Sequence, residues 1–300
     1  MRAGTVALVG RPNAGKSTLM NRLLAEKVAI VSDKPQTTRH RLVGILSGAR
    51  GQMVFFDTPG MHRPLHRLNR QMVRHAVQAM DDADVVCLLV DAAEGFGGGD
   101  AYMLDLVAKT PGPRLLALNK IDLLGKKSAL LPLIERYGRQ AVFAEIVPLS
   151  AATGDGCDRL LDALWNALPE GSPLYDTELL TIHPERFLAA ERIREKVLEQ
   201  TREELPFATA VVIERWEEEP GRKLLRLYAT ILVERPGQKK ILVGRQGQKI
   251  KAIGTAARLD LEAFLGRPLF LDLQVRLEPD WRDDRAILSR LDRDGDLRLD

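Results

Sequence analysis

The 300 residues are long enough for two domains, and their composition excludes several classes of protein. Hydrophobic residues make up 45% of the chain and charged residues 28%, which excludes collagen-like, disordered and low-complexity chains. The longest apolar run, residues 85–90, is far shorter than the roughly 20 residues that a membrane span needs. Two cysteines are too few for a disulfide framework or a cysteine metal cluster, so we expect a globular protein of the reducing cytoplasm.

The net charge of +3 is unevenly distributed along the chain. Residues 235–258 contain no acidic side chain and seven positive ones, which we call the basic segment: Arg235, Lys239, Lys240, Arg245, Lys249, Lys251 and Arg258. A charged run is more often a solvated face than a binding site, so the basic segment needs a second signal before it indicates nucleic acid.

Short runs rich in Val, Ile and Leu alternate with helix-like stretches over the first 168 residues, as in a mostly parallel sheet with helices on both faces. We expect strands at 5–9, 41–46, 52–56, 84–91, 114–119 and 145–149, and a helix at 157–168. Residues 48–51 join the second and third strands as a hairpin, so the α/β sheet should have one antiparallel edge strand.

Residues 169–173 contain two prolines and a glycine, which interrupt helices and strands, and a different pattern follows them. We expect a helix at 184–204, strands at 209–216 and 224–234 around a turn at 219–221, a helix at 255–265 and a strand at 269–277. This is a smaller α+β domain. We therefore divide the chain into a first domain at 1–170, a linker at 171–183, a second domain at 184–289 and a C-terminal tail at 290–300.

Residues 10–17 match the pattern G-x-x-x-x-G-K-[ST] between a predicted strand and a predicted helix, the context of a phosphate-binding loop. Its glycines let backbone N–H groups converge on phosphate oxygens, and the helix N-terminus adds partial positive charge. We expect Lys16 to reach the β and γ phosphates and Ser17 to hold Mg²⁺. The alternative is a plain glycine-rich turn. The residues assigned to this loop are Gly10, Arg11, Pro12, Asn13, Ala14, Gly15, Lys16, Ser17 and Thr18.

Residues Asn119, Lys120, Ile121 and Asp122 follow a predicted strand and indicate which base is bound. The Asp122 carboxylate can accept the N1–H and N2–H₂ protons of guanine, an edge that adenine lacks, and Asn119 can reach the O6 and N7 side. GTP is therefore favoured over ATP. Taken alone, this pattern could be an ordinary turn at the end of a strand. Ser150 and Ala151 follow the last predicted strand of the domain, where a backbone N–H can contact guanine O6.

Residues Asp57, Thr58, Pro59 and Gly60 end the third predicted strand. We expect Asp57 to hold the Mg²⁺ water shell and the Gly60 N–H to sense a γ phosphate. A hydroxyl between the loop and this strand should complete the Mg²⁺ site, with Thr38 preferred over Thr37. We expect Lys16, Thr38 and Gly60 to be the catalytic residues, and Ser17, Thr38 and Asp57 to be the metal ligands. Met61 stands where Ras-like GTPases carry the Gln that orients the attacking water, so we expect slow unassisted turnover.

A G-x-x-G loop, Gly244 to Gly247, lies within the basic segment at a predicted strand-to-helix junction. Glycine permits a close approach of the backbone, and Lys and Arg neutralise phosphates, as a loop that clamps single-stranded RNA requires. The residues assigned to RNA binding are Lys239, Lys240, Gly244, Arg245, Gln246, Gly247, Lys249, Lys251 and Arg258. If four phosphates are neutralised, the affinity should fall with salt at a log–log slope of roughly −3.

The order of these motifs resembles GTPases of the Era/Der type, and the second domain resembles a KH domain of type II. A GTPase domain followed by such a KH domain is similar to the Era family of bacterial ribosome-assembly GTPases. The resemblance covers residues 5 to about 289 and includes the stretches 36–41, 236–240 and 281–284. Gln246 and Gln274 depart from the family pattern, which usually has Lys or Gly at the first position and Trp at the second.

The resemblance implies several partners and cofactors. They are GTP, GDP and Mg²⁺, the 3′ end of 16S-type small-subunit ribosomal RNA, the 30S subunit, and peripheral contact with an anionic inner membrane. An Asn at the position of Asn13 binds K⁺ in related GTPases, which makes K⁺ a candidate here. We expect a monomer. The alternatives are a nucleotide-holding module that barely hydrolyses GTP and a GTPase that acts mainly on anionic lipid.

Overall fold

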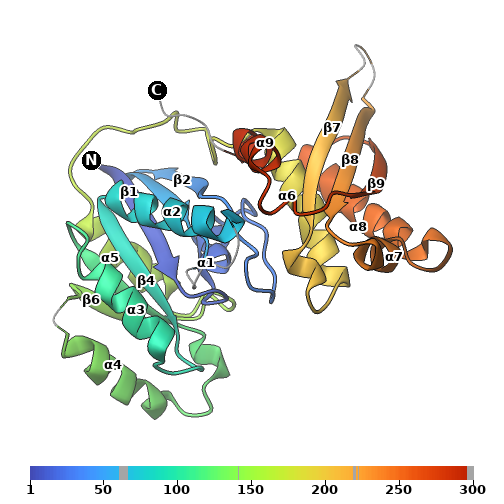
Figure 1. The fold of residues 1–300 in the computed structure, drawn as a ribbon. Coiled ribbons are helices and arrows are strands. Elements are labelled where there is room, and N and C mark those ends of the chain that lie inside the picture. The colour runs from blue at the N-terminus through green and yellow to red at the C-terminus, as the bar shows by residue number, and fades with distance from the viewer. Residues whose placement is uncertain (61–66, 141, 219–220, 222, 296–300) are drawn as a thin grey trace. The chain divides into compact units, whose positions relative to one another are not determined.

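The computed structural model describes residues 1–60, 67–140, 142–218, 221 and 223–295, with only the backbone for residues 292–295. These residues form two compact units (Figure 1). The first unit comprises the described residues up to Ile182 except Arg67 and Leu68, and the second unit comprises those two and the described residues from His183 onward. Among the described residues no helix is long and apolar enough to cross a membrane.

The first unit is built on a six-stranded sheet with the order β2-β3-β1-β4-β5-β6. Its strands are β1 (Arg2–Gly10), β2 (Leu42–Gly48), β3 (Gly51–Asp57), β4 (Val85–Asp91), β5 (Arg114–Asn119) and β6 (Glu145–Pro148). Its helices are α1 (Lys16–Leu24), α2 (Arg67–Asp81), α3 (Gly98–Val107), α4 (Leu130–Gly138) and α5 (Cys157–Ala167). Neighbouring strands are parallel except β2 and β3, so the predicted antiparallel strand at the edge of the sheet is confirmed.

The central strands are apolar because helices cover both of their faces. Residues 6–9 of β1 and 85–90 of β4 are almost completely buried. The carboxyl ends of parallel strands meet at one edge of a sheet. In this sheet Leu8 pairs with Asp57, and Asp91 pairs with Asn119. The sheet therefore brings the ends of β3, β4 and β5 close to the loop that follows β1.

The predicted linker spans residues 171–183, and its part up to Ile182 belongs to the first unit and lies along the outer edge of β2. The N–H of Ile45 donates to the carbonyl of Leu180 at 2.8 Å, and the Thr181 hydroxyl donates to the carbonyl of Val43 at 2.6 Å. The buried Gln52 side chain accepts hydrogen bonds from the N–H groups of residues 174 and 175, at 2.7 and 2.8 Å. This part of the linker is bound to the first unit.

The second unit has the order helix, strand, strand, helix, helix, strand, helix. Its elements are α6 (Glu185–Gln200), β7 (Ala210–Glu218), β8 (Leu225–Val233), α7 (Pro236–Val243), α8 (Gln248–Leu265), β9 (Leu269–Leu277) and α9 (Arg285–Gly295). The sheet order is β7-β8-β9, with β8 antiparallel to β7 and parallel to β9. Apolar side chains of α6 and α8, such as Ile193 and Ile253, form one core with the inner face of this sheet.

Three predictions for the second unit were wrong. Residues before the G-x-x-G loop form the helix α7 and not a strand, because Pro236 occupies its first turn and Gln238 accepts the N–H groups of residues 234 and 235. Helix α8 begins at Gln248, seven residues before its predicted start. The C-terminal tail predicted from residue 290 is helical up to Gly295, in α9, whose first turn the Asp284 carboxylate caps at the N–H groups of residues 286 and 287. Residues 219 and 220 of the predicted turn lie outside the described residues.

Candidate nucleotide site and nucleic-acid interface

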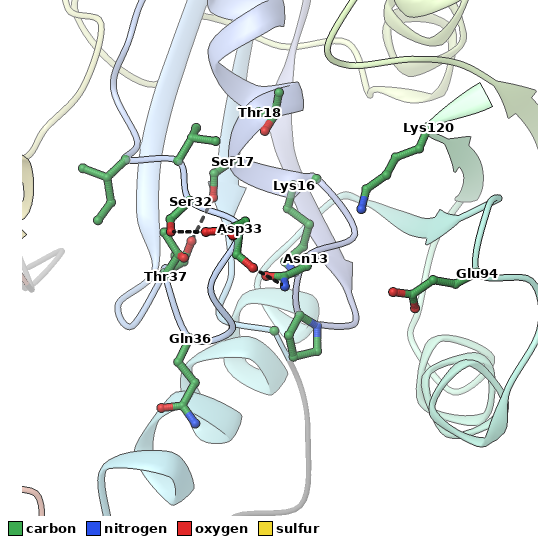
Figure 2. A pocket seen from close by; sticks show the side chains of 16 residues that line it. Asn13, Lys16, Ser17, Thr18, Ser32, Asp33, Gln36, Thr37, Glu94 and Lys120 are labelled. Carbon is green, nitrogen blue, oxygen red and sulfur yellow. Dashed lines mark hydrogen bonds between the residues drawn. The ribbon is translucent and has the colours of Figure 1, made fainter. Parts of the chain in front are cut away.

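A cavity of about 350 Å³ opens at the carboxyl end of β1 (Figure 2). Residues of the phosphate loop, residues 30–33 and residues 36–38 line it. Glu94 and Lys120 lie on the opposite side of Lys16 in this view. The cavity therefore has the predicted phosphate-loop residues beside Lys120, one of the predicted base-binding residues.

The phosphate loop has the backbone conformation that its glycines permit. Gly15 has a φ of +95°, and a Cβ atom there would lie 2.2 Å from the Asn119 amide nitrogen. Gly10 has a φ of +153°, and a Cβ atom there would lie 2.4 Å from the carbonyl of Leu89. Only glycine fits such contacts without displacing a neighbour. Asn13 also has a positive φ, and its side-chain amide donates to the carbonyl of Asp33 at 2.8 Å.

Lys16 is buried and lies against the backbone of its own loop. Its ammonium group donates to the carbonyls of Gly10 and Arg11 at 3.2 and 3.0 Å. Burial lowers the pKa of Lys16 to about 8, although the nearby carboxylate of Asp57 opposes the shift. A cation held in this way is positioned for phosphate oxygens, which is the role predicted for it.

Ser17, Thr38 and Asp57 come together from three separate segments. The Ser17 hydroxyl lies 2.8 Å from the Thr38 hydroxyl and donates to the Asp57 carboxylate at 2.5 Å. The Thr38 hydroxyl reaches the same carboxylate oxygen at 3.3 Å. The Thr37 hydroxyl instead donates to the carbonyl of Lys34 at 2.6 Å.

This cluster fits Mg²⁺, a cation that prefers oxygen ligands. The second carboxylate oxygen of Asp57 is buried and has no hydrogen-bond partner among the described residues. Burial raises the pKa of Asp57 to about 6, while Lys16 and the two hydroxyls act in the opposite direction. A buried carboxylate that lacks full compensation is stabilised by a bound divalent cation.

Asn119 connects the base-binding residues to the phosphate loop. Its amide nitrogen donates to the carbonyl of Ala14 at 2.8 Å, and its amide oxygen accepts the N–H of Ala151 at 2.9 Å. The N–H of Ser150 donates to the carbonyl of Asp155 at 2.8 Å. Asp122 follows on the exposed surface. The arrangement brings the predicted residues of three loops together.

Sequence reasoning missed two acidic residues of this site. Asp91, at the end of β4, pairs with the Lys120 ammonium at 2.6 Å. Glu94 lies 3.4 Å from the Arg11 guanidinium, which also donates to the buried carboxylate of Asp100 at 2.9 Å. The sequence gives a signal for Asp91 alone, which ends a predicted strand; it gives none for Glu94. The Arg11 pairing connects the phosphate loop to the start of α3.

The segment after β3 approaches the phosphate loop closely. The Thr58 hydroxyl donates to the carbonyl of Leu8 at 2.8 Å. A Cβ atom on Gly60 would lie 2.5 Å from the Cα atom of Pro12, so glycine is required there. The backbone of Gly60 therefore lies beside the phosphate site. Met61 lies outside the described residues.

The predicted RNA-binding residues surround the G-x-x-G loop between α7 and α8. Gly244, Gln246 and Gly247 all have a positive φ, and a Cβ atom on Gly244 would lie 2.7 Å from that of Lys249. Lys239 and Lys240 are exposed on α7, and Lys251 is exposed on α8. The charge of Arg258 is paired with Glu262 at 2.7 Å.

A second cavity, of about 270 Å³, lies beside this loop between α8 and β9. Its lining residues are Ile250, Lys251, Gly254, Thr255, Arg258, Leu271 and Leu273. Sequence reasoning assigned Lys251 and Arg258 to the interface but missed Leu271 and Leu273 of β9. The cavity combines apolar walls with two positive side chains.

Comparison with protein families matches each unit separately. The family described as 50S ribosome-binding GTPase matches residues 5–120, and the KH domain family matches residues 204–282. Among curated proteins, the chain is 46% identical to GTPase Era of Geobacter metallireducens over 290 residues, which is 97% of each chain. It is also 46% identical to GTPase Era of Lacticaseibacillus paracasei over 289 residues, 96% of each chain.

Two solved structures match nearly the full chain. A variant of Aquifex aeolicus Era bound to GDP and AlF₄⁻ is 38% identical, with a TM-score of 0.93 over 97% of this chain and 99% of that chain. A structure of Era in complex with MgGDPNP and nucleotides 1506–1542 of 16S ribosomal RNA is 39% identical, with a TM-score of 0.94 over 97% of this chain and 98% of that chain. The similarity thus includes both units.

Proposed function

We propose that this chain, which belongs to the Era family of GTPases, is a GTP-hydrolysing switch that binds the 3′ end of small-subunit ribosomal RNA and assists assembly of the 30S subunit. The observation that carries the nucleotide half of the proposal is the convergence of Ser17, Thr38 and Asp57 beside Lys16. The RNA half is supported by the relative that was solved with 16S ribosomal RNA and by the G-x-x-G loop of the second unit.

We assign one role to each nucleotide-binding group. Lys16 and the N–H groups of the phosphate loop bind the β and γ phosphates, and Asp122 accepts the two guanine N–H groups while Asn119 keeps the loops together. Ser17, Thr38 and Asp57 would hold Mg²⁺, which neutralises phosphate charge when bound. The N–H of Gly60 binds the γ phosphate and loses this contact after hydrolysis.

Hydrolysis transfers the γ-phosphoryl group to water. The water oxygen attacks the γ phosphorus, the bond to the bridging oxygen breaks, and GDP and inorganic phosphate leave. Lys16 stabilises the negative charge that develops on the bridging and γ oxygens. Because a Met at position 61 cannot orient water by a hydrogen bond, we propose that the unassisted rate is slow, on the order of 10⁻⁴ to 10⁻² s⁻¹.

Several finer points belong to the same proposal. We assign GTP to residues 1–170 and RNA to residues 184–289. We propose that the chain is a monomer in the cytoplasm and associates peripherally with the inner membrane. Light scattering would test the monomeric state, and flotation with anionic vesicles would test the membrane association. Asn13 is the proposed K⁺ ligand through its amide oxygen, because its amide nitrogen donates to the carbonyl of Asp33. Equal hydrolysis rates in sodium and potassium buffers would count against that role.

The deciding experiment measures the affinity of the full chain for a short RNA that copies the 3′ end of small-subunit ribosomal RNA. The titration is done with a non-hydrolysable GTP analogue and repeated with GDP. Tight binding with the analogue alone supports a switch that couples the two units. Equal binding in both states would reject a nucleotide-controlled switch. No binding in either state would reject the ribosomal RNA assignment but would leave the assignment of the guanine nucleotide site in place.

A further inference from the structure

The outer face of the sheet in the second unit carries two aromatic rings and an arginine on its three strands. Tyr228 of β8 pairs in register with Arg215 of β7, and Phe270 lies on the neighbouring strand β9. The rings of Tyr228 and Phe270 are 6.1 Å apart in an edge-to-face arrangement. The Arg215 guanidinium carbon lies 3.9 Å from the centre of the Tyr228 ring. We call Arg215, Tyr228 and Phe270 the aromatic face.

The core of the second unit does not use the aromatic face. Core side chains of β8, such as Leu227 and Ala229, point to the opposite side of the sheet, toward α6 and α8. The Phe270 residue is 47% exposed, and the Arg215 side chain is 62% exposed. Large apolar groups left exposed without a role in packing indicate a surface that binds something.

The other half of the same sheet face is already occupied. There Glu214 pairs with Arg276 at 3.2 Å and with Arg290 of α9 at 2.8 Å. Val212 and Leu232 in this half are almost completely buried. The aromatic face is the half that the described residues leave open.

The aromatic face is continuous with the cavity beside the G-x-x-G loop. Strand β9 is an edge of the sheet, and successive residues of a strand point to opposite faces. Leu271 and Leu273 line the cavity, and Phe270 of the same strand lies on the aromatic face. A chain held in the cavity can therefore pass over the free edge of β9 and reach Phe270.

We propose that the aromatic face is a second RNA-contact surface, on which bases of the strand leaving the G-x-x-G cavity stack. The inference rests on the proposed RNA-binding function of that cavity. Single-stranded RNA is bound elsewhere by base stacking on aromatic rings and on arginine planes. The Arg215 guanidinium carbon lies over the Tyr228 ring, so the other side of the guanidinium is available to a base, and Phe270 offers a second stacking surface.

The charges around the aromatic face distinguish its contribution to RNA affinity from the contribution of the basic segment. Arg215 pairs with Glu217 at 3.2 Å, and Asp272 pairs in register with Tyr228 on β9. Arg226 of β8 pairs in register with Phe270 and with Glu217, so two positive and two negative side chains balance on this face, and few counterions are released when a base binds there. Stacking on this face raises affinity without changing the salt dependence, whereas the lysines of the basic segment set that dependence.

The test compares three RNAs on the full chain with the GTP analogue, by fluorescence anisotropy. The short RNA has about six nucleotides, enough for a loop that clamps about four. The other two extend it by about six nucleotides at the 5′ or the 3′ end. The variant Phe270→Leu with Tyr228→Leu keeps apolar volume but removes both rings, and Phe270→Trp keeps a stacking surface. Tyr102→Leu, at a residue 49% exposed in the first unit, is the matched control.

We expect one extended RNA to bind more tightly than the short RNA. The double Leu variant should lose about 5- to 150-fold in affinity for that RNA, the range of one stacked base, with an unchanged salt slope. It should bind the short RNA normally, and Phe270→Trp and Tyr102→Leu should behave like the original chain.

Two results would overturn the proposal while the cavity still binds RNA. One is that neither extension adds affinity, and the other is that the double Leu variant keeps the full gain. Loss of binding to ribosomal particles without loss of binding to free RNA would assign the face to a protein partner and also reject the proposal. Failure of the original chain to bind the short RNA is a different outcome, because it rejects the proposed function itself.

Discussion

The pairing of Arg11 with Asp100 predicts that the phosphate loop depends on a residue at the start of α3. The Arg11 guanidinium donates to Asp100 at 2.9 Å, and the same carboxylate accepts the N–H of Gly97 at 2.9 Å. The Asp100 side chain is only 3% exposed. Because the carbonyl of Arg11 accepts a hydrogen bond from Lys16, the pair also positions the predicted phosphate-binding cation.

The expected size of the effect follows from the burial of the two partners. Hydrogen bonds to charged groups contribute about 1.5–3 kcal/mol, and the lower part of this range applies because the Arg11 side chain is 35% exposed. Arg11→Ala leaves the Asp100 carboxylate buried, with the Gly97 N–H as its remaining donor among the described residues, so we expect a loss of about 2 kcal/mol. Asp100→Asn keeps an acceptor for Gly97 and should lose about 1 kcal/mol.

The assay is thermal unfolding of the full chain, followed at the transition that GDP with Mg²⁺ shifts upward. A loss of about 2 kcal/mol lowers the midpoint of a unit of this size by roughly 4–8 °C. Arg11→Ala should also weaken GDP binding by up to about 30-fold, the same free energy expressed as affinity.

A double-mutant cycle isolates the pair. Arg11→Ala, Asp100→Ala and the double variant should give a coupling free energy of about 1–2 kcal/mol. The exposed pair of Arg50 and Asp162, with side chains 48% and 67% exposed, is the control and should couple by less than about 1 kcal/mol. A coupling at Arg11 no larger than at Arg50 would refute the reasoning.

Three further predictions concern both units. Gly15→Ala places a Cβ atom at a φ of +95° and against the Asn119 amide. GDP affinity measured by calorimetry should therefore fall about 30- to 150-fold. The control Gly125→Ala, where nothing lies within 4 Å of the added Cβ atom, should leave GDP affinity unchanged. Asp122→Asn should reduce GTP binding by about 100-fold or more and favour xanthosine triphosphate, whose C2 carbonyl accepts from an amide; retained guanine preference would exclude Asp122 as the base-binding group. Trp281→Phe removes the 3.0 Å hydrogen bond to the carbonyl of Ala208 at a fully buried site. It should lower the free energy of unfolding of the second unit by about 1–3 kcal/mol, measured at the transition that GDP does not shift. An unchanged midpoint of that transition would contradict the prediction.

The phosphate loop and its partners were predictable because their chemistry leaves a local pattern. The glycines of residues 10–15 and the pattern from Asn119 to Asp122 are contiguous in the sequence, and the strands before them are strongly apolar. Asp91 was missed because its role comes from strand order: it lies beside Asn119 only since β4 pairs with β5. The sequence around Asp91 does not indicate which strand pairs with β4.

Helix α7 shows how a local pattern can mislead. The apolar run Ile241, Leu242 and Val243 contains two β-branched residues with high strand propensity, and it precedes a loop. The helix forms because Pro236 and Gln238 fix its first turn and because Leu242 is completely buried in the core of the second unit. Tertiary packing outweighs the propensity of three residues.

The segment bound along β2 determines where the first unit can be cut from the rest of the chain. A fragment ending at Glu170 would match the predicted linker boundary, but it would remove the residues that donate to Val43 and accept from Ile45. The outer edge of β2 would then have unpaired backbone groups, and exposed strand edges promote aggregation. A fragment ending at Ile182 retains this cover, so a soluble nucleotide-binding fragment should extend to that residue.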